Sequence, residues 1–205
     1  NVSRETYEKF LIYNDILLNW QNRMNLISSA SIPNSFKRHF IDSAQIFSFF
    51  NNCKGNIIDF GSGAGFPGLV LAIMGLKNVH LVESKLKKCN FLKEVSMQTN
   101  TSTKIHNCRI ENLPDLNPSY IISRGLAPTK KLIEICVNYI KNTQKITTKE
   151  KATLKLPNLL FLKGKNYNLE LEELSLTFKN KFEVKKSITS RDGKILFFKS
   201  MRNQK

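Results

Sequence analysis

The sequence predicts an α/β fold with a doubly wound, mostly parallel sheet. Apolar, strand-like runs alternate with helical runs along most of the chain, as they do in consecutive βαβ units. A glycine-rich turn follows the first of these strands, at the position where such sheets bind ligands. Further along, two strand-like runs flank Asp192-Gly193, a dipeptide typical of antiparallel hairpins.

Two helical stretches precede the first strand. Apolar side chains recur at helical spacing over residues 4–22, which predicts an amphipathic helix there. A second helix is expected over residues 33–50, because Pro33 suits a first helical turn. We expect residues 1–52 to form a helical extension packed on a core of residues 53–205, in one globular domain overall.

The core is expected to alternate strands with helices. The expected parallel strands cover residues 56–60, 79–82, 104–107, 120–123 and 158–163. The helices expected among them cover residues 68–75, 85–99 and 129–141. Residues 182–188 and 194–199 are expected to pair as an antiparallel hairpin around the turn Arg191-Asp192-Gly193, which completes a seven-stranded sheet.

The stretch from Lys141 to Pro157 differs from its surroundings in composition. It is rich in Lys, Thr, Asn and Gln and contains few apolar residues. This composition predicts a solvated basic loop, and a contact with RNA is the alternative interpretation.

No stretch approaches the roughly 20 apolar residues that a membrane-spanning helix needs. The first residues also lack the charged and then apolar pattern of a signal peptide, so we expect a cytoplasmic protein that does not bind membranes. The cysteines at 53, 89, 108 and 136 form no C-x-x-C pair, so neither a zinc site nor a redox dithiol is expected. We expect all of them to be buried, reduced thiols.

The chain is strongly basic. A net charge of +16 and a pI near 9.8 indicate a polyanionic partner, with nucleic acid as the first candidate. A bias toward lysine throughout the chain would produce part of the same excess. Arginines are less subject to such a bias, and they lie at positions 23, 38, 109, 124 and 191 among others.

The turn after the first strand carries the clearest motif. Asp59, Gly61, Gly63 and Gly65 form D-x-G-x-G-x-G, the arrangement of class I S-adenosylmethionine-dependent methyltransferases. Glycines there let the backbone take positive φ and approach a ligand closely. Read from Gly63, the same turn also satisfies G-x-G-x-x-G, so an NAD-dependent enzyme is an alternative. That motif would begin two residues later than the dinucleotide fold requires.

Glu83 ends the second strand, about 20 residues after the turn, where a carboxylate can accept the hydroxyls of a bound ribose. Both cofactors contain that ribose, so Glu83 is compatible with either. A structural alternative is that Glu83 caps the helix that follows.

Several further motifs occur in one order along the chain. They are Asn25-Leu26-Ile27-Ser28, Arg38-His39-Phe40-Ile41-Asp42-Ser43, Asp59 to Gly68 with Pro67, Glu83-Ser84, Arg109-Ile110-Glu111, Ile122-Ser123-Arg124, Lys163-Gly164 and Arg191. In this order they resemble the bacterial small-subunit (16S) ribosomal RNA guanine-N7 methyltransferases, also called glucose-inhibited division protein B. The resemblance spans nearly the whole chain and implies a class I methyltransferase fold with S-adenosyl-L-methionine as the cofactor.

The resemblance also implies roles for single residues. The cofactor-binding residues would be Asp59, Gly61, Gly63, Gly65, Phe66, Glu83, Ile110, Glu111 and Arg124. Among these, Ile110 and Glu111 would flank the adenine, and Arg124 would close the site. Read without the resemblance, Ile110 could be a core residue, Glu111 a helix-start acid and Arg124 a surface ion pair.

The RNA-positioning residues implied by the resemblance would be Asn25, Arg38, His39, Arg109, Lys163 and Arg191. His39 could instead be a hydrogen-bonded structural group, and Lys163 a solvated lysine. No general base and no metal ligand are expected, because guanine N7 carries a lone pair and no proton, and orientation alone would allow direct in-line methyl transfer.

The implied substrate is small-subunit rRNA or an assembling small subunit, acted on by a monomer. Two other functions remain open at this point. One is a methyltransferase acting on another RNA, and the other is a non-catalytic rRNA-binding or ribosome-assembly protein with the same fold.

Overall fold

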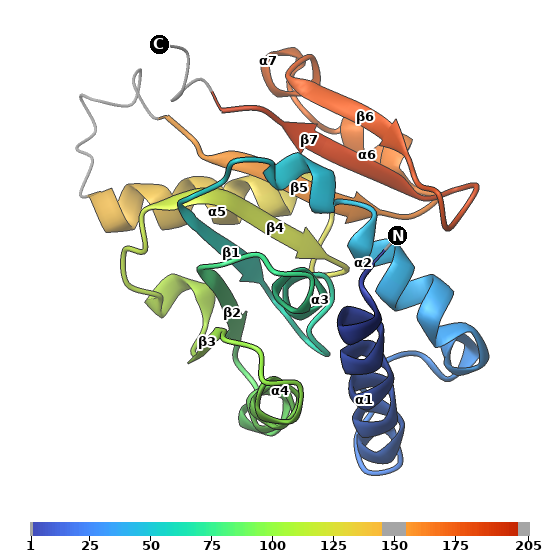
Figure 1. Ribbon diagram of the computed structural model, residues 1–205. Coiled ribbons are helices and arrows are strands. Elements are labelled where there is room, and N and C mark those ends of the chain that lie inside the picture. The colour runs from blue at the N-terminus through green and yellow to red at the C-terminus, as the bar shows by residue number, and fades with distance from the viewer. Residues whose placement is uncertain (1, 145–154, 201–205) are drawn as a thin grey trace.

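A computed structural model of the protein describes residues 2–144 and 155–200. These residues form one seven-stranded sheet in the order β3-β2-β1-β4-β5-β7-β6 (Figure 1). The first five strands in the chain are parallel, and β7 runs antiparallel to both β5 and β6. The predicted doubly wound sheet with an antiparallel hairpin is therefore confirmed.

The strands lie close to their predicted positions. Their bounds are β1 Asn56–Phe60, β2 Val79–Glu83, β3 Lys104–Asn107, β4 Pro118–Arg124, β5 Asn158–Lys163, β6 Phe182–Lys186 and β7 Lys194–Phe198. The helices, which include 3₁₀ and π turns labelled η, are α1 Arg4–Gln21, η1 Ser29–Asn34, η2 Phe36–Ile41, α2 Asp42–Ala44, η3 Phe47–Phe50, α3 Gly68–Ile73, α4 Leu86–Gln98, η4 Ile110–Asn112, α5 Thr129–Gln144, α6 Tyr167–Glu172 and α7 Leu176–Lys179.

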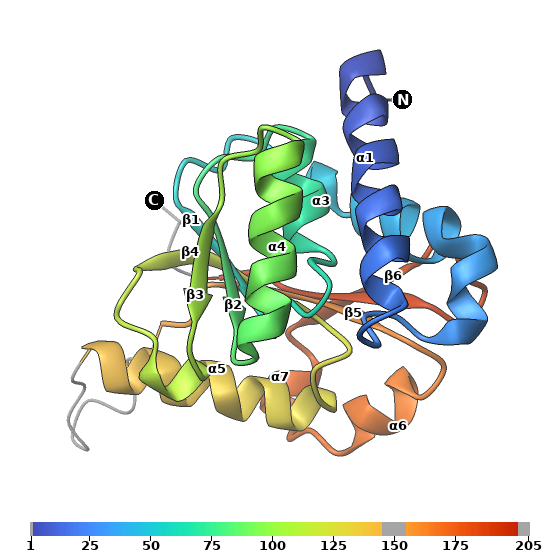
Figure 2. The same ribbon diagram turned by 90° about the horizontal axis from the view of Figure 1, so that it is seen from below.

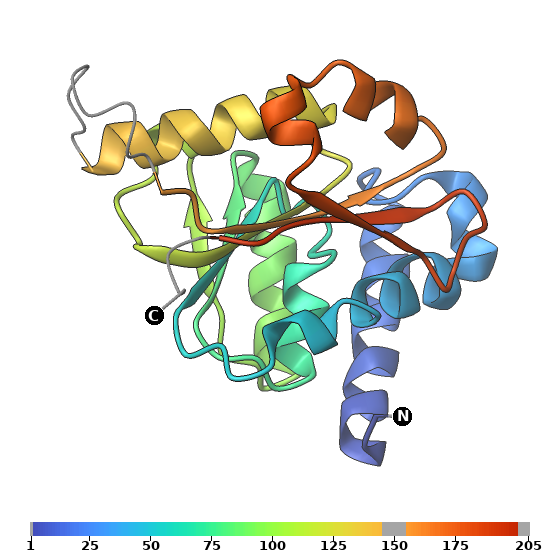
Figure 3. The same ribbon diagram turned by 90° about the horizontal axis from the view of Figure 1, so that it is seen from above.

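Helices cover both faces of the sheet. One face carries α3 and α4 with α1 beside them, and the other carries α5, α6 and α7 (Figures 2 and 3). Successive side chains of a strand point to opposite faces, so Ile57 packs in the core under α1, α3 and α4, whereas Ile58 and Phe60 pack in the core under α5. Every strand position in β1 after Asn56 is therefore buried.

Helix α1 lies against α3 and α4, so the residues before β1 contact the core directly. Ser3 caps its N-terminus by accepting a hydrogen bond from the Thr6 amide at 3.1 Å. The Trp20 indole donates to a carboxylate oxygen of Glu94 on α4 at 2.9 Å. The buried Tyr13 hydroxyl donates to the carbonyl of Ala64, in the turn after β1.

The second predicted helix, over residues 33–50, is wrong as one continuous helix. The chain instead forms the short turns η1, η2, α2 and η3. Pro33 lies near the end of η1 and has no N–H to donate to a continuing α-helical ladder. Residues Phe36–Ile41 then form a wider π turn, a geometry that often occurs at functional sites.

Other expectations also need correction. Helix α5 continues to Gln144, so residues 141–144 of the predicted loop are helical, and residues 145–154 of it lie outside the described part of the chain. The short helices α6 and α7, between β5 and β6, were not predicted. Cys89 and Cys136 are buried, but Cys53 and Cys108 are only partly so, and no disulfide joins them. None of the described helices is both long and apolar enough to cross a membrane.

Candidate functional site

Two adjoining cavities lie beside the turn that follows β1. The smaller has a volume of about 370 Å³ and the larger about 830 Å³. They share Gly61, Gly63, Lys88 and Gly125 as lining residues, so they form one continuous depression. The parallel strands β1, β2 and β4 all end at this edge of the sheet, which is where open α/β sheets bind ligands.

Asp59 lies beneath the turn rather than in either cavity wall. Its side chain is fully buried, and Oδ2 accepts a hydrogen bond from the Gly68 amide at 3.0 Å. Burial raises the pKa of this carboxyl to about 7, although the Gly68 amide favours the ionised form. Oδ1 has no partner among the described residues. Asp59 therefore holds the two ends of the turn together.

The three glycines of the motif have positive φ but different surroundings. Their φ angles are +70° at Gly61, +56° at Gly63 and +87° at Gly65. A Cβ added at Gly63 would meet no atom closer than 3.8 Å, and Gly63 lines both cavities. A Cβ at Gly65 would lie 2.9 Å from the Leu69 Cβ and closer still to Tyr13. Gly63 thus opens toward a ligand, whereas Gly65 accommodates the core.

Glu83 lines the smaller cavity and supports the glycine turn. Its Oε2 accepts from the Gly63 amide at 3.1 Å, and its Oε1 accepts from the Lys85 amide at 2.8 Å. The N-cap of α4 is Lys85, so the alternative expectation that Glu83 itself caps this helix is wrong. Each carboxylate oxygen keeps acceptor capacity for a further donor in the cavity.

The rest of the smaller cavity combines apolar and charged side chains. Ile110 and Glu111, in η4, line it together with the preceding Arg109. Leu126, after β4, and Ile135, on α5, add apolar wall. Arg109, predicted to position RNA, therefore lines the same cavity as the residues predicted to flank the adenine.

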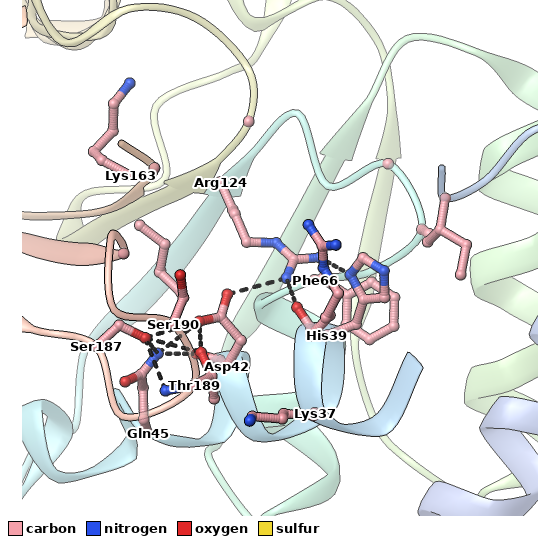
Figure 4. A pocket seen from close by; sticks show the side chains of 18 of the residues that line it. Lys37, His39, Asp42, Gln45, Phe66, Arg124, Lys163, Ser187, Thr189 and Ser190 are labelled. Carbon is pink, nitrogen blue, oxygen red and sulfur yellow. Dashed lines mark hydrogen bonds and ion pairs between the residues drawn. The ribbon is translucent and has the colours of Figure 1, made fainter. Parts of the chain in front are cut away.

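Arg124, the last residue of β4, points into the larger cavity and is held by three groups from the preceding helical turns (Figure 4). Nη1 donates to the Arg38 carbonyl at 3.1 Å and to Asp42 Oδ2 at 3.3 Å. Nη2 lies 2.9 Å from His39 Nδ1. The guanidinium carbon is 4.9 Å from the ring centre of Phe66, which gives a cation–π contact.

His39 is fixed as a neutral imidazole by this arrangement. A guanidinium can only donate, so Nδ1 accepts from Arg124 and Nε2 carries the proton that is donated to Ser31 Oγ at 2.8 Å. Burial first, and then the charges of Arg124 and Arg38, lower the pKa of His39 to about 3. The ring also stacks on Phe66 with a centroid distance of 5.0 Å.

Asp42 joins this cluster to the connection between β6 and β7. Its Oδ1 accepts from Thr189 Oγ1 at 2.6 Å and from Gln45 Nε2 at 2.8 Å. Gln45 Oε1 in turn accepts from the Ile188 amide at 2.9 Å. The larger cavity is therefore closed on one side by a segment more than a hundred positions away in the sequence.

The remaining predicted RNA-positioning residues lie in different environments. Arg38 is exposed and lines the larger cavity. Asn25 is exposed beside Leu26, which lines it, and Arg191 is exposed in the turn before β7. Lys163 also lines the cavity, but its side chain is only 7% exposed and forms an ion pair with Glu170 at 2.6 Å. The solvated lysine considered as the alternative is therefore wrong.

Comparison with known proteins identifies the family of this chain. The family described as rRNA small subunit methyltransferase G matches residues 6–196 of the chain. The chain belongs to this family.

Relatives with the same name support that membership. A Ribosomal RNA small subunit methyltransferase G of Rickettsia prowazekii is 37% identical over 195 residues, which cover 95% of this chain and 94% of the relative. One of Orientia tsutsugamushi is 37% identical over 199 residues, 97% and 93% of the two chains. One of Paramagnetospirillum magneticum is 46% identical over 132 residues, and that match spans only 64% of each chain.

Solved structures confirm the predicted class I methyltransferase fold. A magnesium protoporphyrin IX methyltransferase from Synechocystis PCC 6803, with bound SAM, superposes with a TM-score of 0.58 at 13% identity, covering 96% of this chain and 97% of that one. A tRNA (m1A58) methyltransferase from Aquifex aeolicus gives a TM-score of 0.52 at 15% identity, covering 79% and 69%. The expectation of S-adenosylmethionine as the cofactor of this rRNA methyltransferase family is confirmed.

The structure adds residues that the sequence reasoning did not assign to the site. Lys37, Lys88 and Lys194 line the larger cavity, as do Gln45 and the hydroxyl residues 187, 189 and 190. Asp42 is part of the R-H-x-x-D-S block that contributes to the family resemblance, so the sequence itself marks this residue. The hydroxyl residues have no motif, and only the folded chain brings them to the site.

Proposed function

We propose that this protein transfers the methyl group of S-adenosylmethionine to N7 of a guanine in small-subunit rRNA. The observation that carries the proposal is the pair of joined cavities at the end of the parallel strands. The smaller one offers two carboxylates and apolar walls to a nucleoside, and the larger one is polar and lined by cationic side chains. Such a pair suits a charged cofactor beside a polyanionic acceptor.

The smaller cavity fits the cofactor. Gly63 leaves space where any other residue would place a Cβ, and Glu83 stands beside it with acceptor capacity for ribose hydroxyls. Ile110 and Glu111 would border the adenine, and Phe66 and Arg124 would border the methionine side. When bound, the cofactor supplies an electrophilic methyl group on a sulfonium. Asp59, beneath the turn, would act by holding these backbone positions.

The lining of the larger cavity suits RNA. Lys37, Arg38, Lys88 and Lys194 line it, and none of them forms an ion pair within the described parts of the chain. The one lining carboxylate, Asp42, is paired with Arg124. The cavity wall therefore carries an excess of positive charge, which favours phosphate contacts.

Guanine N7 agrees with the lack of an available imidazole or carboxylate base among the described residues that line the larger cavity. His39 has its only lone pair directed at Arg124, and its other nitrogen carries a proton. Both oxygens of Asp42 already accept hydrogen bonds. An acceptor that must lose a proton would need a base, whereas N7 reacts through an in-plane lone pair. The protein would contribute orientation and a fixed electrostatic environment.

The experiment measures transfer of tritiated methyl from S-adenosylmethionine to small ribosomal subunits, total rRNA and tRNA in parallel, followed by nucleoside analysis. We expect label as 7-methylguanosine in small-subunit RNA. Label in another nucleoside or only in tRNA would refute the proposed acceptor. No label in any RNA, with cofactor binding intact, would refute the proposed activity.

Two arginine variants test the site within the same assay. Arg124→Ala removes a guanidinium from the cavity, and we expect it to lower methyl transfer at least tenfold. Arg4→Ala removes one from the start of α1, where the side chain is 93% exposed and is not part of the cavity lining, and we expect no change. Equal losses in both variants would show that methyl transfer depends on the total positive charge of the protein and not on Arg124 in particular.

A further inference from the structure

We propose that Asp42 is a positioning residue that fixes the Arg124 guanidinium and ties it to the connection between β6 and β7. This inference rests on the proposed methyl transfer, because it assigns Asp42 a role through Arg124 in that reaction. Neither the glycine motif nor the cofactor cavity involves Asp42.

The pair has the geometry of a shielded, charge-assisted contact. Asp42 Oδ2 lies 3.3 Å from Arg124 Nη1, and each side chain is 19% exposed. The two residues are 82 positions apart, so the contact joins the helical turns before β1 to the end of β4. Limited exposure lessens solvent screening of this pair relative to a surface ion pair.

The hydrogen bonds of Arg124 show which of its N–H donors remain available to a bound molecule. A guanidinium has five N–H donors. Both on Nη1 are used, by the Arg38 carbonyl and Asp42, and one on Nη2 is used by His39. The Nε donor and one Nη2 donor keep no partner among the described residues. A guanidinium held on its other edge can therefore offer these two donors to a bound molecule in one orientation.

Asp42 is itself held from the other side. Thr189 Oγ1 and Gln45 Nε2 donate to Oδ1, and Ser187 Oγ lies 3.4 Å from the same oxygen. Figure 4 shows Gln45, Ser187 and Thr189 gathered around Asp42. The Ile188 amide donates to Gln45 Oε1, so both side chains and the backbone of this connection are engaged. Because Oδ1 is taken up by these donors and Oδ2 faces the guanidinium, we assign Asp42 an effect on the cavity that acts through Arg124.

The decisive experiment is a double-mutant cycle with Asp42→Asn and Arg124→Ala. Asparagine keeps the shape and can still accept from Thr189, but its amide would face the Nη1 donor and break the pair. We expect Asp42→Asn to lower kcat/KM for small-subunit RNA about tenfold, an effect of roughly 1.4 kcal/mol on the transition-state free energy. In the Arg124→Ala background, the same substitution should cost less than twofold.

Two further variants separate positioning from folding. Asp15→Asn makes the same chemical change at an exposed position of α1 and should leave kcat/KM unchanged. Thr189→Val removes one donor to Oδ1 and keeps the ion pair, so we expect a smaller loss that is also absent in the Arg124→Ala background. If Asp42→Asn does not fold, the Thr189→Val cycle decides the question.

A spectroscopic measurement makes the test independent of turnover. In ¹⁵N NMR spectra we expect the Arg124 guanidinium protons to be resolved by slow rotation in the unmodified protein and averaged in Asp42→Asn. Full activity of Asp42→Asn, an equal loss in both backgrounds, or unchanged guanidinium signals would overturn the inference. Absence of methylation by the unmodified protein would refute the proposed function instead, and the NMR signals would still decide the role of Asp42.

Discussion

The Tyr13 hydroxyl occupies the space that a Cβ at Gly65 would need: the two atoms would lie 2.5 Å apart. Tyr13 is on α1 and Gly65 is in the cofactor turn, so the first helix and the turn are fitted to each other. The third glycine of the motif serves this fit rather than the ligand.

Alanine substitutions should therefore act differently at Gly65 and Gly63. Gly65→Ala adds a clash with buried atoms to a positive φ, and we expect a loss of about 3 kcal/mol in unfolding free energy. Gly63→Ala places its methyl group in open cavity space, so it should cost only about 1 kcal/mol in unfolding free energy. The same methyl group would occupy part of the cavity and weaken S-adenosylmethionine binding. Chemical denaturation and calorimetric titration measure the two effects. Equal stability losses would contradict this assignment.

Tyr13→Phe tests the same contact between α1 and the turn by changing the residue on α1. It leaves the buried Ala64 carbonyl without its donor, which should lower the unfolding free energy by about 1–2 kcal/mol. Tyr7→Phe, at a tyrosine that is 51% exposed on the same helix, should change it little. Denaturation midpoints of the two variants measure the difference, and a neutral Tyr13→Phe would show that the hydrogen bond contributes no net stability.

His39 should remain uncharged throughout the pH range of activity. Burial and the adjacent Arg124 lower its pKa from 6.5 to about 3. The neutral ring therefore contributes stability that is complete above pH 6.5 and is lost as pH falls toward 3. ¹⁵N NMR should show the Nε2-protonated tautomer from pH 8 down to pH 5. Histidines of the urea-unfolded chain, which should titrate near pH 6.5, are the control, and titration of folded His39 in that range would contradict the arrangement.

The Lys163–Glu170 pair should affect stability more than RNA binding. Burial raises the pKa of Glu170, but hydrogen bonds from Lys163 and Thr129 outweigh it and lower the pKa overall. Lys163→Met leaves the carboxylate without its ammonium partner and should cost about 2–3 kcal/mol. Lys165→Met, at the exposed lysine nearby, should cost little.

The same pair has a defined pH dependence. Because the pKa of Glu170 is below its ordinary value, the contribution of the pair is present above about pH 4.5 and is lost as pH falls further. Urea denaturation at pH 7 and at pH 4 measures this change. If Lys163→Met instead raised KM for RNA with stability unchanged, the lysine would be a phosphate contact, as the resemblance implied.

The strands were predictable because the pattern of apolar and turn residues along a short stretch of sequence indicates where each one lies. The runs that became β1 and β5 are mostly apolar, and the observed bounds of β1, β3 and β5 equal the predicted ones. The breaks between Ser29 and Phe50 were not predictable in the same way. Their apolar spacing is helical and favours one continuous helix, whereas the folded chain forms 3₁₀ and π turns after Pro33.

Site residues were predictable where a motif or a fixed spacing within one stretch of sequence identifies them. Glu83 was placed by its distance in sequence from the glycine turn, and the structure puts it against Gly63. Partners that join distant segments could not be predicted, such as Asp42 with Thr189, 147 positions apart. Lys163 has a partner only seven positions away, but Glu170 lies on α6, a helix too short to leave a clear periodic pattern.

The order of the strands has a consequence for synthesis of the chain. Strand β7 is the last described strand to be made, yet it lies between β5 and β6. A nascent chain that has not reached residue 194 leaves both neighbours without an antiparallel partner. The residues before β1 are translated first, but Asp42 must wait for Thr189 to leave the ribosomal exit tunnel. The wall of the larger cavity therefore cannot be complete until residues 187–190 have left the tunnel.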